Sequence, residues 1–434
     1  MEKKILKAGL LGLGTVGTGV YKLFEAQKEE MIHKIGAELE LKKILVRPQS
    51  MERAKGIVRE GIELTSDWRS IVEDEEIDII IEVMGGTEFA KECILAALNA
   101  GKSVVTSNKD LVAIDGKELL DTAAANNCDF LFEAAVAGGI PIIRPLKQCL
   151  AGNHLTEVMG IINGTTNFIL TKMTLEGMDY QEALALATEL GYAEADPTAD
   201  VEGIDAARKV AILASIAFNS RVVLGDVYTE GITRLTKADI EYAKEMGWTI
   251  KLIGMARNTE TGIEVRVHPM LIPSTHPLAS VNDSFNAVFV HGDAVDDAMF
   301  YGRGAGELPT ASAIMGDVMD IARDIRFNCK ARINCTCYKQ LPIKTIDECN
   351  NSYYIRLMAD NQPGVLSNIA KVFGDHNVSI AQFIQRNAEE HQAEMVLITE
   401  NVLEKDFNAA MEQLKALSIV KDVSAVIRVY GKNS

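Results

Sequence analysis

The fold of the N-terminal third is decided by the stretch Ile5-Leu-Lys-Ala-Gly-Leu-Leu-Gly12-Leu-Gly14-Thr-Val-Gly17. Its first seven residues form an apolar run that is typical of a buried strand. Residues 16–31 then carry a helical pattern. A strand, a Gly-x-Gly-x-x-Gly loop and a helix in this order predict a dinucleotide-binding unit rather than an incidental glycine-rich turn.

The three glycines have separate tasks in such a unit. Gly12 makes the tight turn, Gly14 lets the backbone approach a pyrophosphate, and Gly17 lets the helix pack on the strand. The free N–H groups at the start of the helix, at Thr15 and Val16, are expected to meet the pyrophosphate.

The second strand, predicted over Leu39–Val46, bears on the choice of cofactor. A carboxylate at its end would bind a ribose 2′-hydroxyl and favour NAD. The strand ends instead in Val46-Arg47-Pro48, and an arginine can hold the 2′-phosphate of NADP with two hydrogen bonds. Arg47 therefore predicts a preference for NADP. The basic residues at 53, 55 and 59 can add to this preference, although a solvated basic face explains them equally well.

Two further strands place polar residues at an edge of the predicted sheet. Residues 77–83 and Ser103–Thr106 have the patterns of parallel strands, and Ser107-Asn108-Lys109 follows the second of them. Open α/β sheets bind ligands at the carboxyl ends of their strands, so Ser107 and Lys109 are expected near cofactor or substrate. An ordinary loop lysine fits the position of Lys109 equally well.

The stretch 191–209 concentrates charge in a loop and a helix. It holds four carboxylates and one lysine: Glu194, Asp196, Asp200, Asp205 and Lys209. A helix predicted over Val201–Phe218 puts Asp205 and Lys209 on one face, with Glu202 close by. A lysine held by carboxylates can donate a proton, although on spacing alone a solvated surface ion pair is the commoner explanation.

Two loops of small and polar residues precede predicted helices. Asn163-Gly-Thr-Thr-Asn167 can cap a helix that begins near Phe168, which is the commoner role, or present amides and hydroxyls to a ligand. Tyr301–Thr310 is a second glycine-rich loop before a helix over 311–326. That loop can meet a cofactor or serve as a plain helix entry.

The C-terminal part changes pattern after an aperiodic linker over 331–351. Strands and helices then follow in the order β-α-β-β-α-β, which is the order of a ferredoxin-like module. No catalytic constellation of residues lies within it. A binding or regulatory role is therefore expected for this module.

Composition bounds the class of protein. A chain of 434 residues predicts two or three domains, and a formal charge of −17 argues against nucleic acid and anionic membranes as partners. No apolar run is long enough to span a bilayer and no signal peptide is recognisable, so a cytoplasmic protein is expected. Seven scattered cysteines fit reduced thiols. Cys335-Thr-Cys337 is at most half a metal site, because no nearby pair completes four ligands.

These segments together resemble the homoserine dehydrogenase family, in the form that carries a C-terminal ACT domain. The most specific part is Ala187-x3-Gly191-Tyr-Ala-x2-Asp196-Pro197-x2-Asp200-Val-x-Gly203-x-Asp205-x3-Lys209. The resemblance covers essentially the whole chain and implies a mixture of α/β and α+β architecture. The implied domains are a Rossmann-type NAD(P)-binding domain over 1–140 joined by the helix near 310–330, an α+β catalytic and dimerisation domain over 141–330, a linker over 331–351, and a ferredoxin-like βαββαβ ACT domain over 352–434.

The resemblance also implies an activity. This is the reversible NAD(P)H-dependent reduction of L-aspartate 4-semialdehyde to L-homoserine, on the route to threonine, methionine and isoleucine. Lys209 matches the family's proton donor, and Lys109 matches its second active-site lysine. Glu194 matches the carboxylate that binds the substrate amino group, while Asp200 and Asp205 match acids that hydrogen-bond the substrate or orient the lysine.

Further partners follow from the resemblance. A monovalent cation, usually sodium, is expected at Glu133 and at the backbone carbonyls of Val136, Gly138 and Ile140, and Gly302 is expected to contact the cofactor. The ACT domain is expected to respond to an amino-acid effector, threonine. A homodimer or homotetramer is expected. A fused aspartate kinase is not expected, because the chain begins at the nucleotide-binding strand.

Two alternative functions stay open from the residues alone. One is a different amino-acid or hydroxy-acid dehydrogenase on the same cofactor fold, which assays with homoserine, malate and aspartate would separate. The other is a nucleotide-responsive binding protein without turnover. The closely spaced lysine and carboxylates over 194–209 count against that second alternative.

Overall fold

The computed structural model describes residues 5–333, 335–386 and 391–431. Two compact units make up the chain. Unit 1 consists of Met1–Val158, Ala211–Leu224 and Asn286–Gln340, and unit 2 of Met159–Val210, Gly225–Phe285 and Leu341–Ser434. None of the described helices is long and apolar enough to cross a membrane.

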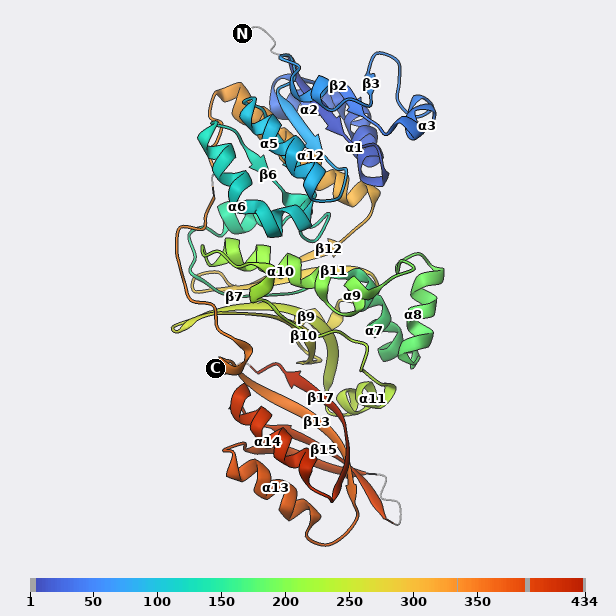
Figure 1. The fold of residues 1–434 in the computed structure, drawn as a ribbon, viewed down its shortest axis with the longest axis vertical. Coiled ribbons are helices and arrows are strands. Elements are labelled where there is room, and N and C mark those ends of the chain that lie inside the picture. The colour runs from blue at the N-terminus through green and yellow to red at the C-terminus, as the bar shows by residue number, and fades with distance from the viewer. Residues whose placement is uncertain (1–4, 334, 387–390, 432–434) are drawn as a thin grey trace. The chain divides into compact units, whose positions relative to one another are not determined.

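Unit 1 contains a six-stranded parallel sheet in the order β3-β2-β1-β4-β5-β6 (Figure 1). Its strands are β1 (Ile5–Leu11), β2 (Glu38–Leu45), β3 (Glu63–Thr65), β4 (Ile79–Glu82), β5 (Ser103–Thr106) and β6 (Phe130–Leu131). The side chains of β4 are all buried, which explains the continuous apolar run that the sequence shows there. The predicted Rossmann-type sheet is confirmed.

Helices cover this sheet. They are α1 (Thr15–Ala26), α2 (Lys28–Ile35), α3 (Met51–Lys55), α4 (Arg69–Val72), α5 (Glu88–Asn99), α6 (Lys109–Ala125) and α12 (Glu307–Phe327). Although α12 is far along the chain, it packs against α1, α2 and the strands β4 and β5, and Val318 and Ile321 join the same core as Val20 (Figure 1).

The single helix predicted over 16–31 is wrong. Gln27 leaves the helical conformation (φ −112°, ψ 14°), and the chain continues as the separate helix α2. The change of direction lets Met31 and Ile35 reach the core, where each is 2% exposed. A helical periodicity read along the sequence does not reveal such a bend.

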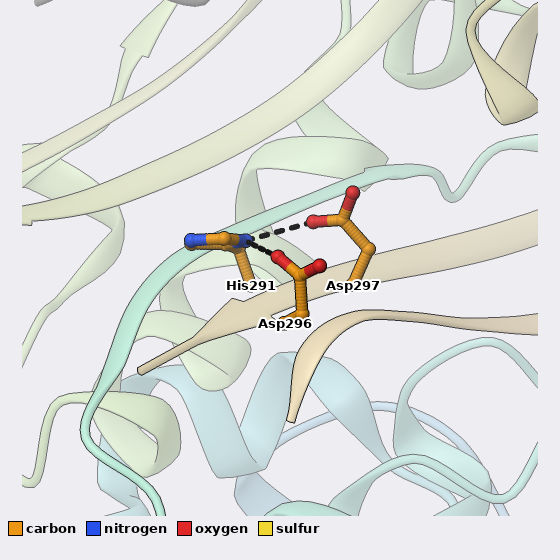
Figure 2. A group of neighbouring side chains, drawn as sticks. All are labelled: His291, Asp296 and Asp297. Carbon is orange, nitrogen blue, oxygen red and sulfur yellow. Dashed lines mark hydrogen bonds and ion pairs between the residues drawn. The ribbon is translucent and has the colours of Figure 1, made fainter. Parts of the chain in front are cut away.

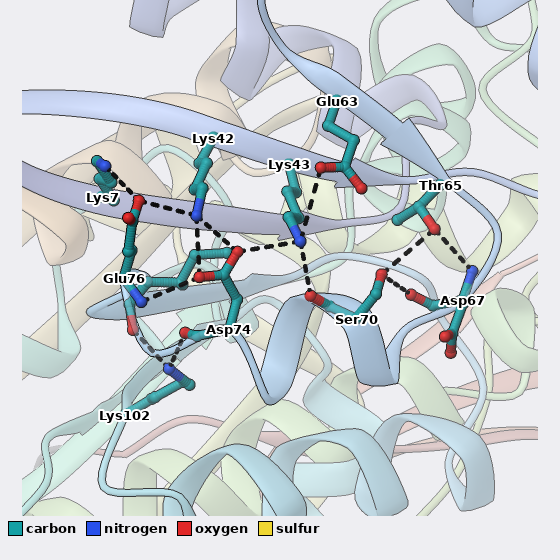
Figure 3. A network of polar contacts seen from close by, with 11 residues as sticks. Lys7, Lys42, Lys43, Glu63, Thr65, Asp67, Ser70, Asp74, Glu76 and Lys102 are labelled. Atoms are coloured by element: carbon teal, nitrogen blue, oxygen red, sulfur yellow. Dashed lines mark hydrogen bonds and ion pairs between the residues drawn. The ribbon is translucent and has the colours of Figure 1, made fainter.

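A network of lysines and acids holds the segment that leads into β4 (Figure 3). The register between β1 and β2 shifts at Ala8/Gly9, so the adjacent Lys42 and Lys43 both reach Asp74, at 2.7 Å and 3.0 Å. Lys102 adds a hydrogen bond of 2.6 Å to the Asp74 carbonyl. Burial works against the charge on Asp74, but the bonds from Lys42 and Lys43 hold its pKa below the ordinary value.

Unit 2 contains a sheet in the order β9-β10-β17-β13-β15-β14, with β8 beside β10 and β16 beside β13. The strands are β8 (Tyr228–Thr229), β9 (Trp248–Thr259), β10 (Gly262–Pro273), β13 (Asn350–Asp360), β14 (Ile380–Arg386), β15 (Gln392–Thr399), β16 (Val402–Leu403) and β17 (Val420–Val429). The helices are α7 (Gly164–Glu176), α8 (Tyr180–Glu189), α9 (Thr198–Val201), α11 (Lys237–Glu245), α13 (Val365–Asp375) and α14 (Glu404–Ala416).

The predicted ferredoxin-like module is confirmed. Its elements follow as β13-α13-β14-β15-α14-β17, and α13 and α14 lie side by side against one face of its antiparallel sheet (Figure 1). The short strand β16 is an addition that the sequence pattern did not predict. A parallel pairing of β17 with β10, at Met270↔Arg428, joins the module to the rest of unit 2.

Two buried arginines reinforce this junction within unit 2. Arg356 of β13 donates to Asp239 of α11 at 2.8 Å, and Asp239 is fully buried. Arg428 of β17 donates to Glu230 at 2.9 Å and also pairs with Glu404. Buried carboxylates need such partners, so the module is held to the rest of unit 2 by charge as well as by backbone pairing.

Asp74→Asn should lower the free energy of unfolding by about 1–2 kcal/mol at neutral pH, because Lys43 loses its close acid. The folded-state pKa of Asp74 lies below its unfolded value of about 4, so this stabilisation exists above that value and disappears as pH falls through the lower folded pKa. Urea unfolding of both proteins from neutral to acid pH measures the difference, which should shrink below about pH 4.

The matched control is Glu63→Gln, because Glu63 also lies near Lys43 but is 57% exposed. This change should cost less than about 0.5 kcal/mol. A difference between Asp74→Asn and the unaltered protein that stays constant down to acid pH would contradict the account of the network.

Candidate active site

The lysine and acid at the end of the stretch 191–209 form a buried ion pair. Both lie on α10 (Ile204–Ala217), and Lys209 Nζ is 2.6 Å from Asp205 Oδ2. Lys209 also donates to the Ile162 carbonyl oxygen at 2.7 Å. The two side chains are only 12% and 11% exposed. The explanation as a solvated surface pair is therefore wrong for these residues.

The helix predicted over 201–218 is interrupted near its start. Gly203 has φ +81°, a left-handed conformation, and separates α9 from α10. A β-carbon at Gly203 would also lie 3.1 Å from Val267, so the position accepts little but glycine. Glu202 consequently lies outside the helix of Asp205 and accepts a hydrogen bond from Thr233 instead.

Asn163 joins the ion pair to a second acid. It follows β7 (Leu155–Ile161), and its amide donates to Asp200 at 2.7 Å and to Asp205 at 2.9 Å. Its side-chain oxygen, Oδ1, accepts a hydrogen bond from the Thr166 N–H at 2.9 Å and so caps α7. The capping role considered for the Asn163–Asn167 loop is therefore confirmed, while the presentation of its amides and hydroxyls to a ligand stays a prediction.

We call Asn163, Asp200, Asp205 and Lys209 the lysine–carboxylate cluster. Burial raises the pKa of Asp200 and the charge of Asp205 adds to the rise, while hydrogen bonds from Asn163 and Thr165 oppose it. With Asp200 ionised, two carboxylates face one ammonium, so the cluster has a net negative charge. Such a cluster can donate a proton from Lys209 and can attract a cationic group of a ligand.

Glu194 belongs to the same unit but not to the cluster. It lies in the exposed loop between α8 and α9. No side-chain hydrogen bond or ion pair joins Glu194 to the cluster within the described part of the chain. Its predicted role toward a substrate amino group stays a prediction.

The glycine loop of unit 1 has the shape that a dinucleotide requires. Gly12 has φ +108°, and a β-carbon on Gly17 would lie 2.1 Å from the Gly12 carbonyl oxygen. A β-carbon on Gly14, in contrast, would meet nothing within 4 Å. The backbone is therefore open at Gly14, just before α1 begins at Thr15 and Val16, where a pyrophosphate would bind.

The carboxyl edge of the same sheet is organised by a buried acid that sequence analysis missed. Glu82, fully buried at the end of β4, accepts from Thr106 Oγ1 at 2.6 Å and from the Met84 N–H at 2.7 Å. Burial raises the pKa of Glu82. Its place at the end of a buried strand was the only available signal. Glu82 thereby fixes the loops after β4 and β5.

The residues after β5 lie at this edge. Asn108 caps α6 by accepting from the Leu111 N–H at 3.1 Å, and Lys109 is the first residue of that helix. Ser107 is half-buried beside them. Arg47 is exposed after β2, directly before the short helix Pro48–Ser50. These positions fit cofactor contacts at the expected edge of the sheet.

The predicted cation residues form a tight loop in unit 1. Both oxygens of the buried Glu133 carboxylate accept main-chain N–H groups of Ile142, Ile143 and Arg144, at 2.5–2.7 Å. Gly138 has φ +52°, which turns the chain between Val136 and Ile140. Carbonyl oxygens in such a turn are the hard ligands that sodium takes. A sodium ion would therefore be bound by main-chain oxygens of this loop, because the Glu133 carboxylate is already hydrogen-bonded to three main-chain N–H groups.

Gly302 lies close to this loop. It belongs to β12 (Asp296–Arg303), the neighbour of β11 (Phe285–Gly292), and a β-carbon there would lie 3.3 Å from the Ile140 side chain. The Gly139 N–H donates to the Arg303 carbonyl at 3.1 Å. The second glycine-rich loop and the predicted cation loop are therefore neighbours within unit 1.

A different group of possible metal ligands stands on β11 and β12 (Figure 2). His291 Nδ1 is 2.7 Å from Asp297 and 3.7 Å from Asp296. Asp296 is 88% exposed, so water satisfies these groups readily. The cluster is an ordinary surface contact and differs from the predicted cation loop in both position and chemistry.

Three family models match the chain in order. The model of the homoserine dehydrogenase NAD binding domain matches residues 12–133, the homoserine dehydrogenase model 141–319, and the ACT domain model 353–418. The homoserine dehydrogenase of Corynebacterium glutamicum is 48% identical over 425 residues, 97% of this chain and 94% of the relative. The chain belongs to the homoserine dehydrogenase family. It is an NAD(P)-dependent oxidoreductase with a C-terminal ACT domain.

Other relatives match nearly the whole chain or most of it. The Bacillus subtilis homoserine dehydrogenase is 42% identical and covers 99% of both chains. A homoserine dehydrogenase structure from Thiobacillus denitrificans has a TM-score of 0.93 at 42% identity and covers 98% of both. A hyperthermophilic archaeal homoserine dehydrogenase mutant in complex with NADPH has a TM-score of 0.63 at 27% identity, covering 73% of this chain and 98% of its own.

Asn163→Ala should lower both stability and homoserine oxidation, because it removes a helix cap and the amide shared by Asp200 and Asp205. We expect a loss of about 2–3 kcal/mol in the free energy of unfolding. Asn163→Ser is the matched variant, since serine keeps a cap but cannot bridge the two acids. It should recover much of the stability and leave kcat low.

Urea unfolding and steady-state kinetics of both variants give the measurement. A serine variant with normal kcat would contradict the bridging role of Asn163 toward the two acids.

Proposed function

We propose that this enzyme catalyses the reversible reduction of L-aspartate 4-semialdehyde to L-homoserine, with Lys209 as the proton donor. The observation that carries the proposal is the position of the Lys209 side chain, which is only 12% exposed and donates to Asp205 and to the Ile162 carbonyl. A lysine held by two hydrogen bonds, in a chain with a dinucleotide-binding loop, supports a role as the general acid of a carbonyl reduction.

The geometry of Lys209 supports this task. An ammonium group has three N–H donors, and Asp205 and the Ile162 carbonyl take two of them. The third can donate to a substrate oxygen. A bound nicotinamide would supply the hydride for the substrate carbon. Lys209 would stabilise and protonate the oxygen that gains charge in the same event. In homoserine oxidation, Lys209 takes that proton back.

The charge of the cluster favours an amino-acid substrate. Asp200 and Asp205 outnumber the single ammonium of Lys209, so a second cationic group is attracted to the cluster. We assign that place to the substrate ammonium, with Glu194 as a further acid on the adjoining loop. The resemblance to the family supports Lys109 as the second lysine near the reacting atoms.

A preference for NADP over NAD forms part of the proposal. It is supported by the exposed Arg47 at the end of β2, where the chain carries no acid, and by the archaeal relative that was crystallised with NADPH. Gly12, Gly14 and Gly17 with the start of α1 would hold the pyrophosphate. Ser107 and Gly302 are proposed as further contacts.

A sodium ion bound by the carbonyls of Glu133, Val136, Gly138 and Ile140 is also proposed, supported by the oxygen chemistry of that loop. Activity measured in sodium and in a larger organic cation tests it. A rate that does not depend on the cation would count against the site.

We propose feedback by threonine through the ACT domain and a place in threonine, methionine and isoleucine synthesis. The junction of β10 with β17 and the ion pair of Arg428 with Glu230 support communication with the rest of unit 2. Titration of threonine against the initial rate tests this proposal. A homodimer or homotetramer and a cytoplasmic location stay predictions from the sequence.

Lys209→Ala should lower kcat by about 10²–10⁴, the usual contribution of a general acid, and leave the Kd for NADPH nearly unchanged. Steady-state kinetics with aspartate semialdehyde and a fluorescence titration with NADPH measure the two quantities. Lys237→Ala is the control, because Lys237 is 54% exposed and its ion pair with Glu241 is long, at 4.0 Å. Near-normal turnover of Lys209→Ala would overturn the assignment.

Arg47→Glu should raise KM for NADPH at least tenfold and affect KM for NADH much less, because an acid at this position repels a 2′-phosphate. The ratio of kcat/KM for the two cofactors measures the change. Lys117→Glu provides a charge-matched control, because Lys117 is 71% exposed on α6. An unchanged ratio in Arg47→Glu would contradict the cofactor assignment.

A further inference from the structure

A small cavity of about 30 Å³ lies in unit 2, where β9 and β10 meet the ferredoxin-like module. Two arginines line it, Arg257 of β9 and Arg266 of β10. The other polar side chains of its wall include Asn350, Asn351, Ser352 and Asn401. None of the described residues that line the cavity is an acid. The proposed dehydrogenase site does not use it.

The guanidinium of Arg266 is buried with too few acceptors. Arg266 is 2% exposed, and its one hydrogen bond to a described residue runs from Nη1 to Glu264 Oε2, at 3.3 Å. Its Nε–H is buried without an acceptor in the described part of the chain. A guanidinium carries five N–H donors, so most of them have no acceptor among these residues. Burial of a charge in this state is costly unless a further partner balances it.

Glu264 alone does not balance the cations around it. The register between β9 and β10 sets Arg257 directly opposite Glu264, on the face of the sheet that also carries Arg266. Lys344 donates to Glu264 Oε1 at 2.8 Å. Three cations therefore face one carboxylate, which leaves two positive charges in excess beside the cavity. Burial lowers the pKa of Arg266 in spite of the opposing charge of Glu264.

The neighbouring acids of the module are held by another arginine. Glu404 pairs with Arg428, and Glu230 accepts from the same guanidinium at 2.9 Å. Arg428 is thus balanced by two carboxylates. Neither of them has a hydrogen bond with Arg266, so the excess charge at the cavity is not removed by the nearest ion pairs.

We propose that this cavity binds a small inorganic anion, chloride or one of similar size, beside Arg257 and Arg266. The geometry carries the proposal: a buried guanidinium with one long hydrogen bond, two positive charges in excess, and a polar wall without acids. A volume of about 30 Å³ is roughly twice the room that one water molecule requires, so a single-atom anion fits. The inference does not depend on the proposed dehydrogenase chemistry.

A bound anion would connect two parts of unit 2. Arg257 and Arg266 belong to β9 and β10, whereas Ser352 lies on β13 and Asn401 lies between β15 and β16. An anion that accepts N–H and O–H groups from both sides would add hydrogen bonds across the junction at which β17 pairs with β10. Anion binding is therefore expected to stabilise the attachment of the ferredoxin-like module.

Water is the competing occupant of the cavity. His268 lies two residues after Arg266 on the same face of β10, and its Nε2 atom is buried without a partner among the described residues. A water molecule that accepts from Arg266 and donates to His268 would satisfy both groups. It would leave the excess positive charge unbalanced, however, and this favours the anion.

The first experiment is a crystal of the full-length protein, grown without halides and soaked in sodium bromide. Bromide replaces chloride and is identified by its anomalous scattering. We expect an anomalous peak in the cavity, in contact with the guanidinium of Arg266. Density for water without an anomalous signal would overturn the proposal. Peaks confined to exposed arginines would show an adventitious ion only and would overturn it as well.

The second experiment measures the Tm of the full-length protein at constant ionic strength while chloride replaces gluconate, an anion too large for the cavity. A saturable rise of about 2 °C is expected once chloride exceeds its Kd tenfold. A parallel titration with sodium phosphate identifies the kind of anion. A rise with phosphate but none with chloride would contradict the assignment to a single-atom anion, and so would a Tm that is independent of both.

Arg257 supplies the matched pair of variants, because it is only half-buried. Arg257→Gln should raise the chloride concentration at the midpoint of the Tm change about tenfold, since a charged hydrogen-bond donor is lost. Arg257→Lys keeps the charge and should shift the midpoint much less.

Arg234→Gln is the control, because Arg234 is an exposed arginine of the same unit. A chloride effect that is unchanged in Arg257→Gln, or reduced equally in Arg234→Gln, would contradict the site. Both experiments are read without turnover, so their failure is distinguishable from failure of the dehydrogenase assignment.

Discussion

The arrangement of the candidate active site depends on the largely buried ion pair between Asp205 and Lys209. Removing two charges from water is costly, and their mutual attraction offsets that cost only when further hydrogen bonds satisfy both groups. Here Asn163 donates to Asp205, and the Ile162 carbonyl accepts from Lys209. The fold therefore brings the end of β7, the loop before α10 and α10 itself to one point. As a consequence, two N–H donors of Lys209 have acceptors within the described part of the chain, and we propose that the third donates to the substrate.

Backbone constraints keep that point in place. Gly203 interrupts the helical conformation between α9 and α10. Asp200 on α9 and Asp205 on α10 therefore approach Asn163 from two separate helices. Elsewhere in unit 2, β17 pairs with β10, and Arg428 donates to the Glu230 carboxylate. The main-chain N–H of Glu230 in turn donates to the Val267 carbonyl oxygen. Gly203 packs against the Val267 side chain as well. A continuous set of contacts thus leads from the ACT domain to the loop of the cluster.

Local sequence signals predicted much of this structure. The glycine loop, the parallel strands and the ferredoxin-like order depend on neighbouring residues, and the spacing of Asp205 and Lys209 placed them on one face. Burial of the pair was not predictable from that spacing, because Asn163 lies 42 residues before Asp205. The breaks at Gln27 and Gly203 and the role of Glu82 likewise depend on residues distant in sequence.

The most direct test is a crystal structure of the enzyme with NADP⁺ and L-homoserine. We predict that the substrate hydroxyl oxygen lies within about 3 Å of Lys209 Nζ and that the substrate ammonium faces the carboxylates of Asp200 and Glu194. A substrate hydroxyl more than about 5 Å from Lys209, bonded to another proton donor instead, would contradict the account.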